Sequence, residues 1–478
     1  MNNGNELKYR RNRRKKNKSI LLIVLTVVML ILAALLLKFM LPKGSTPSDN
    51  EGKPSGEVTP GGEDENTDTP EVTPDPQEVE NAAKEEAKRL LDELMDKADR
   101  IAKGYDYDGA IELLSTAEDY ETNTEITERI KKYEEEKTNL VEWEDVTKVS
   151  HVFFHSLIVD TAKAFDGDPR EAGYNEVMTT VDEFNKIMKQ MYDRGYVLVR
   201  MHDLADFVTT EDGSKKFTRG KIMLPEGKIP FILSQDDLNY YDYMKTDGFA
   251  HRLVIGEDGM VTTEMDLEDG SSVRGSFDVV PLLEDFIREY PDFSYRGARG
   301  ILAITGYEGV FGYRTSRRSY PDSLTIEEDT KTATEVANRL KEMGWELASH
   351  SWGHRWMGQI SYDKFTWDTN IWESEVKPIL GETDIYIYPY GDDIGDWRPY
   401  KGDKYKFLKE KGFMYFCTVD AAGPYWGQMT DEYYRQGRIN LDGMRMYEAI
   451  SGGRNRVEPF FDVESVFDKS RPLPVPGV

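Results

Sequence analysis

The sequence predicts an α/β fold: a distorted (β/α) barrel of about seven strands, preceded by a transmembrane helix and a small α-helical region. Three observations predict it. They are a long apolar run near the amino terminus, a segment with helical periodicity, and then short apolar runs that alternate with amphipathic stretches. Because single cores stop growing at roughly 250–300 residues, a chain of 478 residues is expected to contain more than one domain.

The amino-terminal segment has the pattern of a membrane anchor. Residues 20–41 are apolar apart from Thr26 and Lys38, and about 20 such residues span a bilayer, which predicts a transmembrane helix at 19–41. Residues 1–18 form a basic tail that the positive-inside rule assigns to the cytoplasm. A cleaved signal peptide is the alternative, but its apolar core is usually about 7–15 residues long. We therefore expect a single-pass protein of the cell membrane with an extracytoplasmic catalytic domain.

Two segments separate this anchor from the main domain. Residues 42–78 are rich in Pro, Gly, Thr, Ser, Asp and Glu, which predicts a disordered linker. Residues 79–140 have Ala, Leu and Ile at helical spacing, which predicts a helical hairpin or stalk domain. Within it, Ala98 to Ala117 resembles one tetratricopeptide-type hairpin. The segment is expected to be a stalk packed on the catalytic domain or, alternatively, a module that binds a protein partner.

Charge and cysteine content exclude some functions. The formal net charge of −27, carried despite the basic tail, argues against a nucleic-acid ligand. The single cysteine, Cys417, lies in an apolar run and is expected to be a buried, unreactive thiol.

Residues 146–478 are predicted to form the catalytic domain. Seven strand–helix alternations favour a barrel. The expected strands are Val149–Val159, Tyr196–Met201, Pro230–Leu233, Gly300–Thr305, Trp345–Ala348, Ile385–Tyr388 and Phe413–Val419. Helices are expected at Val181–Arg194, Val279–Tyr290 and Thr332–Met343. Asp258-Gly259 and Asp269-Gly270 predict a β-hairpin insertion at about 249–276.

Three polar clusters directly follow predicted strands, where barrel enzymes carry their catalytic groups. They are Ser234-Gln235-Asp236-Asp237, His350-Ser351-Trp352-Gly353-His354 and Tyr388-Pro389-Tyr390-Gly391. One Asp with two imidazoles suits zinc or another borderline divalent ion, and three protein ligands leave positions open for water and substrate. A second, adjacent Asp can then act as a base on that water. Gly353 and Trp352 disfavour a helix, so the two histidines are expected on a turn.

These residues resemble the motifs of the polysaccharide deacetylases, the NodB-homology domain of carbohydrate esterase family 4, over about residues 149–443. The resemblance implies Asp236 as the catalytic base and Asp237, His350 and His354 as the metal ligands. It also implies zinc as the cofactor, with cobalt, manganese or nickel as alternatives. Ser351 is then expected to hydrogen-bond behind the ligands.

The same resemblance suggests substrate contacts. Tyr390 is expected to offer its backbone N–H to the oxyanion and its ring to the groove. The rings of Trp352 and Tyr388 are also expected to contact the sugar.

Two family features are missing from their usual places. The Arg that precedes Pro-Tyr-Gly in many members is absent before Pro389, and no histidine follows His354 to act as the general acid. Poly-N-acetylglucosamine deacetylases with a circularly permuted barrel, which the chain resembles most in pattern, carry that histidine on the first strand. Phe153-Phe154-His155 occupies the equivalent position, so His155 is expected to protonate the leaving amine.

The predicted function is metal-dependent, hydrolytic de-N-acetylation of N-acetylhexosamine units in a cell-surface polysaccharide, either peptidoglycan or a poly-N-acetylglucosamine-like polymer. Asp236 is expected to activate the metal-bound water. Two alternatives stay open: a catalytically silent, membrane-anchored glycan-binding protein, and a metal-dependent O-acetyl esterase on the same fold.

Overall fold

A computed structural model describes residues 76–478. The predicted basic tail 1–18, the transmembrane helix 19–41 and nearly all of the linker 42–78 lie outside the described residues. From residue 76 onward, none of the helices is long and apolar enough to cross a membrane. Residues Asp75–Val478 belong to one compact unit, which includes both the helical segment and the predicted catalytic domain.

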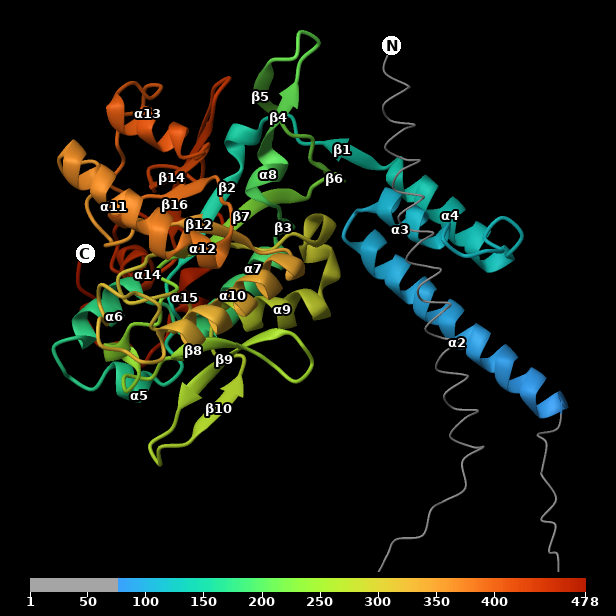
Figure 1. Cartoon of the computed structure of the whole chain (residues 1–478), viewed down its shortest axis with the longest axis horizontal. Coiled ribbons are helices and arrows are strands. Elements are labelled where there is room, and N and C mark those ends of the chain that lie inside the picture. Colours follow the sequence, from blue (N-terminus) through green and yellow to red (C-terminus); the bar gives the residue numbers. More distant parts are fainter. Residues whose placement is uncertain (1–75) are drawn as a thin grey trace, which may run out of the picture. The chain divides into compact units, whose positions relative to one another are not determined.

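Seven parallel strands close into the predicted barrel (Figure 1). In order around the ring they are β2 (Ser150–Phe154), β7 (Ile229–Gln235), β11 (Ile301–Ile304), β12 (Glu346–Ser349), β13 (Ile385–Ile387), β14 (Tyr415–Val419) and β16 (Tyr434–Asn440). The last strand, β16, pairs in parallel with the first, β2, with Ile439 opposite Val152. The ring is therefore closed by strands from opposite ends of the domain.

Alternate residues of these strands belong to two separate apolar clusters, as the two-residue period of a strand requires. In one cluster, Phe231 and Leu302 pack with helical side chains such as Phe184 and Trp372, so it fills the layer between strands and helices. The other includes Ile232 and Ala303, which face the barrel interior. Cys417 is buried in this inner cluster, as predicted, and burial raises the pKa of its thiol to about 12.

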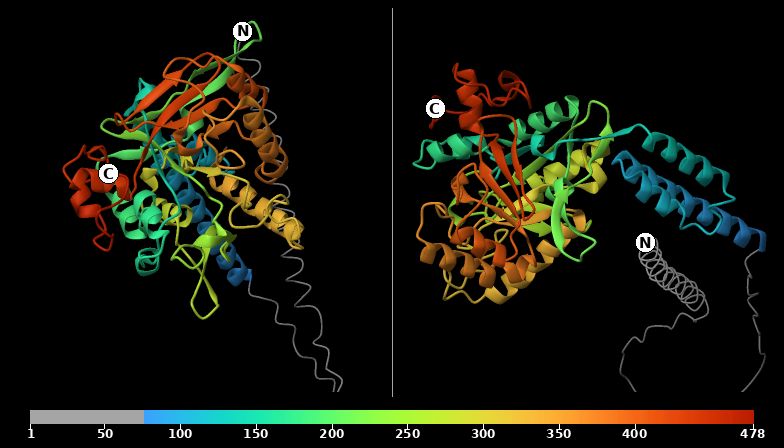
Figure 2. Two further views of the ribbon diagram at one scale, coloured as in Figure 1. Left: turned by 90° about the vertical axis from the view of Figure 1, so that its left-hand side faces the viewer. Right: turned by 90° about the horizontal axis from the view of Figure 1, so that it is seen from above.

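Helices lie outside the ring of strands (Figure 2). They are α5 (Thr161–Ala164), α6 (Glu171–Val177), α7 (Val181–Asp193), α8 (Met201–Leu204), α9 (Val279–Glu289), α10 (Ile326–Met343), α11 (Tyr362–Glu375), α12 (Lys377–Leu380), α13 (Asp403–Glu410), α14 (Gly443–Ile450) and α15 (Val463–Val466). Helix α7 starts in a capping box between Thr180 and Glu183. The three helices expected from the sequence correspond to α7, α9 and α10.

The predicted number of strands was right, but one member of the ring was wrong. The segment expected at Tyr196–Met201 forms β3 (Tyr196–Leu198), which pairs with the first half of β7 and lies outside the ring. Its place in the ring is taken by β16, which is fully buried although it contains Arg435, Gln436 and Arg438. Because these polar residues interrupt any apolar run, the sequence pattern did not predict β16.

Two further predictions need correction. The strand expected at Val149–Val159 ends at Phe154, because beyond it the Ile158 N–H donates to Thr179 O instead of to a strand partner.

The insertion at 249–276 is a three-stranded antiparallel sheet, not a single hairpin. Its strands are β8 (Arg252–Ile255), β9 (Val261–Asp266) and β10 (Ser272–Gly275). Both Asp-Gly pairs form turns, with positive φ at Gly259 and Gly270, so two hairpins share β9.

The remaining strands are peripheral. They are β1 (Leu140–Glu142) paired with β6 (Met223–Pro225), β4 (Ala205–Thr209) paired with β5 (Lys215–Arg219), and β15 (Trp426–Met429), which is antiparallel to β16.

The helical segment consists of α2 (Pro76–Lys103), α3 (Tyr107–Leu114) and α4 (Thr124–Lys137). Its α2–α3 turn contacts the barrel domain. The Arg296 guanidinium donates to Asp106 Oδ1 at 2.7 Å, and the Tyr105 hydroxyl donates to the carbonyl of Asp292 at 2.9 Å. The turn thus joins the segment to the domain by hydrogen bonds as well as by the chain itself.

His202 gives a prediction for the pH dependence of stability. Its ring contacts Glu346, at the start of β12, and Asp384, just before β13. Burial lowers its pKa, but the hydrogen bonds and charges of Asp384 and Glu346 outweigh burial and raise it from 6.5 to about 10. A raised pKa adds stability that is complete below the unfolded-state pKa and is lost as the pH rises through the folded-state value.

We therefore expect the stability advantage of wild type over His202→Gln, measured by urea denaturation, to shrink between about pH 7 and about pH 10. His251→Gln is the matched control, because burial lowers the pKa of His251 and moves its contribution to acid pH. An advantage over His202→Gln that stays constant across this range would show that His202 is not charged in the fold.

Candidate active site

The site residues lie at the carboxyl ends of four barrel strands. Asp236 and Asp237 follow β7, His350 follows β12, Tyr390 follows β13 and His155 follows β2. Parallel strands bring their carboxyl ends to one end of a barrel, so residues separated by up to 235 positions meet there.

Asp237, His350 and His354 form a group that fits a divalent metal ion. One ligand atom from each lies within 4.8 Å of the other two. The Nε2 atoms of His354 and His350 are 3.5 Å and 4.0 Å from Asp237 Oδ1. The His350 Nδ1–H donates to the carbonyl of Ile387 at 2.8 Å, which leaves Nε2 as the atom that can bind a metal. Burial lowers the pKa of His350 to about 4, so its imidazole is neutral, as ligation requires.

The two histidines lie on an irregular turn, as expected, and not on a helix. Ser351 and His354 both have positive φ, which is unfavourable for residues other than glycine. Asp368 of α11 holds the turn by accepting from the backbone N–H groups of Trp352 at 2.7 Å and Gly353 at 3.0 Å. A Cβ atom at position 353 would be 2.9 Å from Asp368 Oδ2, so glycine leaves room for this carboxylate. The sequence contained no signal for the role of Asp368.

Asp236 is paired with an arginine that sequence analysis missed. Arg438 of β16 donates to Oδ1 at 2.6 Å and to Oδ2 at 2.9 Å, and both side chains are buried. Burial raises the pKa of Asp236, but the Arg438 charge outweighs it and holds that pKa well below its usual range. The guanidinium also lies over the Phe153 ring, 4.2 Å from its centroid. The arginine that is absent before Pro389 thus has a counterpart on another strand, β16.

His155 is half-buried at the end of β2 and is oriented by the backbone. Its Nδ1–H donates to the carbonyl of Val177 at 3.0 Å, which leaves Nε2 free for other contacts. Its charge lowers the pKa of Asp236 and Asp237, so the ring belongs to the same electrostatic environment. It also acts on the buried Asp442, whose pKa burial nevertheless raises.

Aromatic rings adjoin the metal-ligand group. The Tyr390 ring is 4.4 Å from the His354 ring and is stacked on Trp356 at 4.3 Å, with only 7° between the ring planes. Tyr390 is 53% exposed and Trp356 is 49% exposed. The Asp392 carboxylate joins the two loops that carry these rings by accepting from the N–H groups of Gly358 and Gln359.

A second aromatic group contacts Asp237. The hydroxyl of Tyr241 donates to Asp237 Oδ1 at 2.9 Å, and its ring stacks on Tyr243 and Tyr307. Tyr241 therefore orients the carboxylate that would bind the metal.

Three expected contacts are not formed as predicted. Tyr388 is completely buried, so its side chain cannot contact a polymer, and Trp352 is only 8% exposed because its indole packs inside and donates to Glu375. The Ser351 hydroxyl is buried without a hydrogen-bond partner among the described residues, so it does not orient a ligand. The sugar contacts of Trp352 and Tyr388 were predicted only because both residues lie in the motifs. The alternation of side chains along the strand places the Tyr388 ring on the side that faces the helices.

A parallel α/β barrel with an Asp-His-His group at its carboxyl end has the architecture of a barrel hydrolase. The family model described as polysaccharide deacetylase matches residues 323–415, which include His350, His354 and Tyr390. This part of the chain is therefore similar to polysaccharide deacetylases, the family that its motifs resemble.

Two solved structures are similar to the chain at low identity. The deacetylase PplD of Streptococcus pyogenes, solved with acetate, is 12% identical, with a TM-score of 0.36 over 68% of this chain and 100% of that one. A polysaccharide deacetylase from Bacillus cereus is 12% identical, with a TM-score of 0.32 over 63% of this chain and 65% of that one. Among curated proteins, none matches the chain.

The Asp236–Arg438 pair gives a stability prediction. Arg438→Met is expected to destabilise the protein by about 3–5 kcal/mol, because it leaves a buried carboxylate without its partner. The double variant Asp236→Leu/Arg438→Met removes both charges and should recover most of that loss. Chemical denaturation measures both. Equal destabilisation of the single and double variants would mean that packing, and not the ion pair, accounts for the effect.

Proposed function

We propose that the protein is a metal-dependent N-deacetylase of an N-acetylhexosamine polymer at the cell surface. The observation that carries the proposal is the Asp237–His350–His354 group with the ionised Asp236 beside it at the carboxyl end of the barrel. A buried carboxylate next to an open ligand set is the pairing that metal-assisted hydrolysis requires.

Asp237, His350 and His354 would hold the divalent cation. Zinc suits this donor set best, and cobalt, manganese and nickel also accept it. When bound, the cation would supply Lewis acidity that polarises the acetamide carbonyl and increases the acidity of water. The neutral His350 and the Tyr241 hydrogen bond to Asp237 support this role, because both prepare the ligand atoms before any ion arrives.

Asp236 would accept the proton of the attacking water. Its pairing with Arg438 keeps it ionised at neutral pH, so it is always in the form that can accept a proton. The N–H of Asp236 donates to Phe154 O at 2.8 Å, which fixes the backbone of the base against β2.

His155 would protonate the departing amine. Amide cleavage needs an acid at nitrogen because an amide anion is a very poor leaving group. With Nδ1–H held by Val177 O, the Nε2 atom is the one from which a proton can be transferred.

The stacked Trp356–Tyr390 pair supports a sugar polymer as the substrate. Two rings that are parallel, half-exposed and fixed by Asp392 present a flat apolar surface beside His354. The apolar face of a hexosamine ring matches such a surface. The Tyr390 N–H remains our proposed donor to the oxyanion.

The membrane anchor at 19–41 remains a proposal, and it would place the catalytic domain on the extracytoplasmic side of the cell membrane. The substrate would then be peptidoglycan or a poly-N-acetylglucosamine-like polymer. The segment 79–140 would act as a stalk or bind a protein partner. The presence of Arg438 beside Asp236 weakens the case for a catalytically silent glycan-binding protein, because an arginine is present although the one before Pro389 is absent.

Acetate release tests this proposal. The full chain, purified in detergent, would be incubated with N-acetylglucosamine oligomers or peptidoglycan and a divalent metal. We expect release that chelation or Asp237→Ala abolishes, because both remove metal ligation, and that the nearby surface variant Asp242→Ala retains. Release that survives chelation contradicts metal dependence. Absence of release, with no metal found by elemental analysis, favours glycan binding, and release from O-acetylated substrates alone favours the esterase.

Trp356 provides a second test. Trp356→Ala should lower kcat/KM for N-acetylglucosamine oligomers about 3- to 10-fold, matching the roughly 0.5–1.5 kcal/mol of one ring contact, and spare p-nitrophenyl acetate, which is too small to reach it. Trp367→Ala is the matched control. Trp367 is similarly exposed, but the guanidinium groups of Arg318 and Arg355 lie over its ring. Equal losses in both variants would argue against a sugar contact at Trp356.

A further inference from the structure

We infer that Arg471, seven positions before the last residue, is a positioning residue for His155. The inference rests on the proposed role of His155 as the acid. It extends that role by identifying what holds the imidazole in the required orientation.

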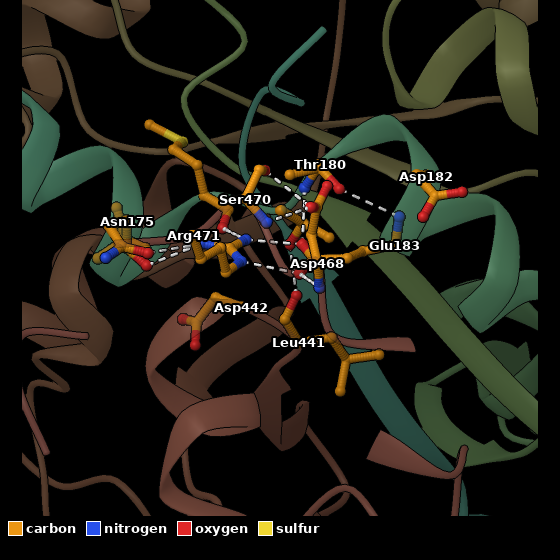
Figure 3. Close-up of polar contacts among 12 residues, drawn as sticks. Asn175, Thr180, Asp182, Glu183, Leu441, Asp442, Asp468, Ser470 and Arg471 are labelled. Atoms are coloured by element: carbon orange, nitrogen blue, oxygen red, sulfur yellow. Dashed lines mark hydrogen bonds and ion pairs between the residues drawn. The ribbon is translucent and has the colours of Figure 1, made fainter. Parts of the chain in front are cut away.

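The Arg471 guanidinium is the centre of a buried polar cluster (Figure 3). It donates to both carboxylate oxygens of Glu183, at 2.7 Å and 2.6 Å. It also donates to the backbone carbonyl of Asn175 at 3.0 Å and of Met178 at 2.7 Å. Both side chains of the Arg471–Glu183 pair are completely buried. The carboxyl-terminal segment is thereby fixed to the end of α6, at residues 175–178.

The end of α6 carries the hydrogen-bond acceptor of His155. Val177 lies between the two residues whose carbonyls Arg471 binds, and its own carbonyl accepts from His155 Nδ1–H at 3.0 Å. A carbonyl can only accept, so this bond keeps a proton on Nδ1 and leaves Nε2 for the reaction. Arg471 therefore fixes the backbone that selects the tautomer and the direction of the imidazole.

Two neighbouring contacts restrict the end of α6 further. The Thr179 hydroxyl donates to Leu441 O at 2.6 Å, and the Asn175 side-chain amide donates to Pro472 O at 2.7 Å. A Cβ atom at Gly443 would lie 2.0 Å from Asn175 O and 2.5 Å from an Arg471 nitrogen, so only glycine fits here. We call the contacts of Arg471 and Pro472 with residues 175–178 the clamp. The clamp packs directly against Gly443, which begins α14 just after β16.

Removing Arg471 alone would leave a buried Glu183 charge and could unfold the protein. The test therefore uses Glu183→Gln/Arg471→Met, which removes both charges and keeps an acceptor for the Thr180 N–H at the start of α7. Arg471→Lys is the second variant, because lysine keeps the charge but lacks the planar fork that reaches both carbonyls. Glu284→Gln/Arg299→Met is the matched control, since this pair is also bidentate and largely buried but makes no contact with residues 175–178 among those described.

Three quantities would be measured on the full chain: the Tm, the tautomer of His155 by NMR of ¹⁵N-histidine-labelled protein, and the ratio of N-acetyl to ester hydrolysis. The His155 signals are assigned by their loss in His155→Gln. In the clamp variants we expect a shift away from Nδ1–H and a fall of about 10- to 100-fold in N-acetyl turnover, as for a misplaced catalytic group. Hydrolysis of p-nitrophenyl acetate needs no acid and should change little.

A clamp variant that folds and keeps the wild-type tautomer overturns the inference, even if its Tm falls. If the double variant does not fold, Arg471→Lys decides by the same criterion. If the wild type itself releases no acetate, the proposed function fails, but the His155 tautomer still shows whether Arg471 positions the ring. The control pair should leave both the tautomer and the hydrolysis ratio unchanged.

Discussion

Burial of two arginines on one barrel strand is the constraint on which the site depends. Arg435 and Arg438 of β16 lie inside the fold, where a charge without a partner costs several kcal/mol. Arg438 is satisfied by Asp236. Arg435 is satisfied by Asp393 and by the carbonyls of Asp396 and Gly395, in the loop that follows Tyr390. One strand therefore fixes both Asp236 and the loop that leads away from the exposed aromatic pair.

Backbone strain is concentrated at the same end of the barrel. Asp237, Ser351, His354 and Tyr390 all have positive φ values although none is glycine. Such conformations cost of order 1–3 kcal/mol each and persist only where the surroundings impose them. Here the surroundings are identifiable: Asp368 binds the histidine turn, and Asp392 joins the loops of Trp356 and Tyr390. Two carboxylates outside the metal-ligand set thus determine where the reacting groups lie.

At the carboxyl end of the barrel the charged pairs are buried, whereas two of the aromatic rings are exposed. Asp236 is paired with Arg438 below the surface, whereas Tyr390 and Trp356 keep about half of their area in solvent. This separation suits a hydrolase for a polymer, because ionised groups stay out of contact with bulk water and a flat surface remains open to a long chain.

The sequence by itself determined the fold class, six of the seven ring strands and the Asp-His-His group. Strong apolar runs mark those strands, and short motifs such as His350-Ser351-Trp352-Gly353-His354 need only local spacing to be recognised. It did not predict β16, because the polar side chains of that strand have no apolar period. Arg438, for example, is satisfied by Thr418, 20 residues away, and by Asp236, 202 residues away.

Tertiary structure alone decided which residue pairs with Asp236, which aromatic rings stay exposed and what orients His155. Asp236 and Arg438 are brought together by barrel closure, and Tyr388 is buried because its side chain faces the helices. These outcomes depend on contacts between distant segments. The spacing of residues in a sequence identifies only the neighbours of a residue along the chain. Burial and charge pairing depend on its neighbours in space, so they could not be predicted from that spacing.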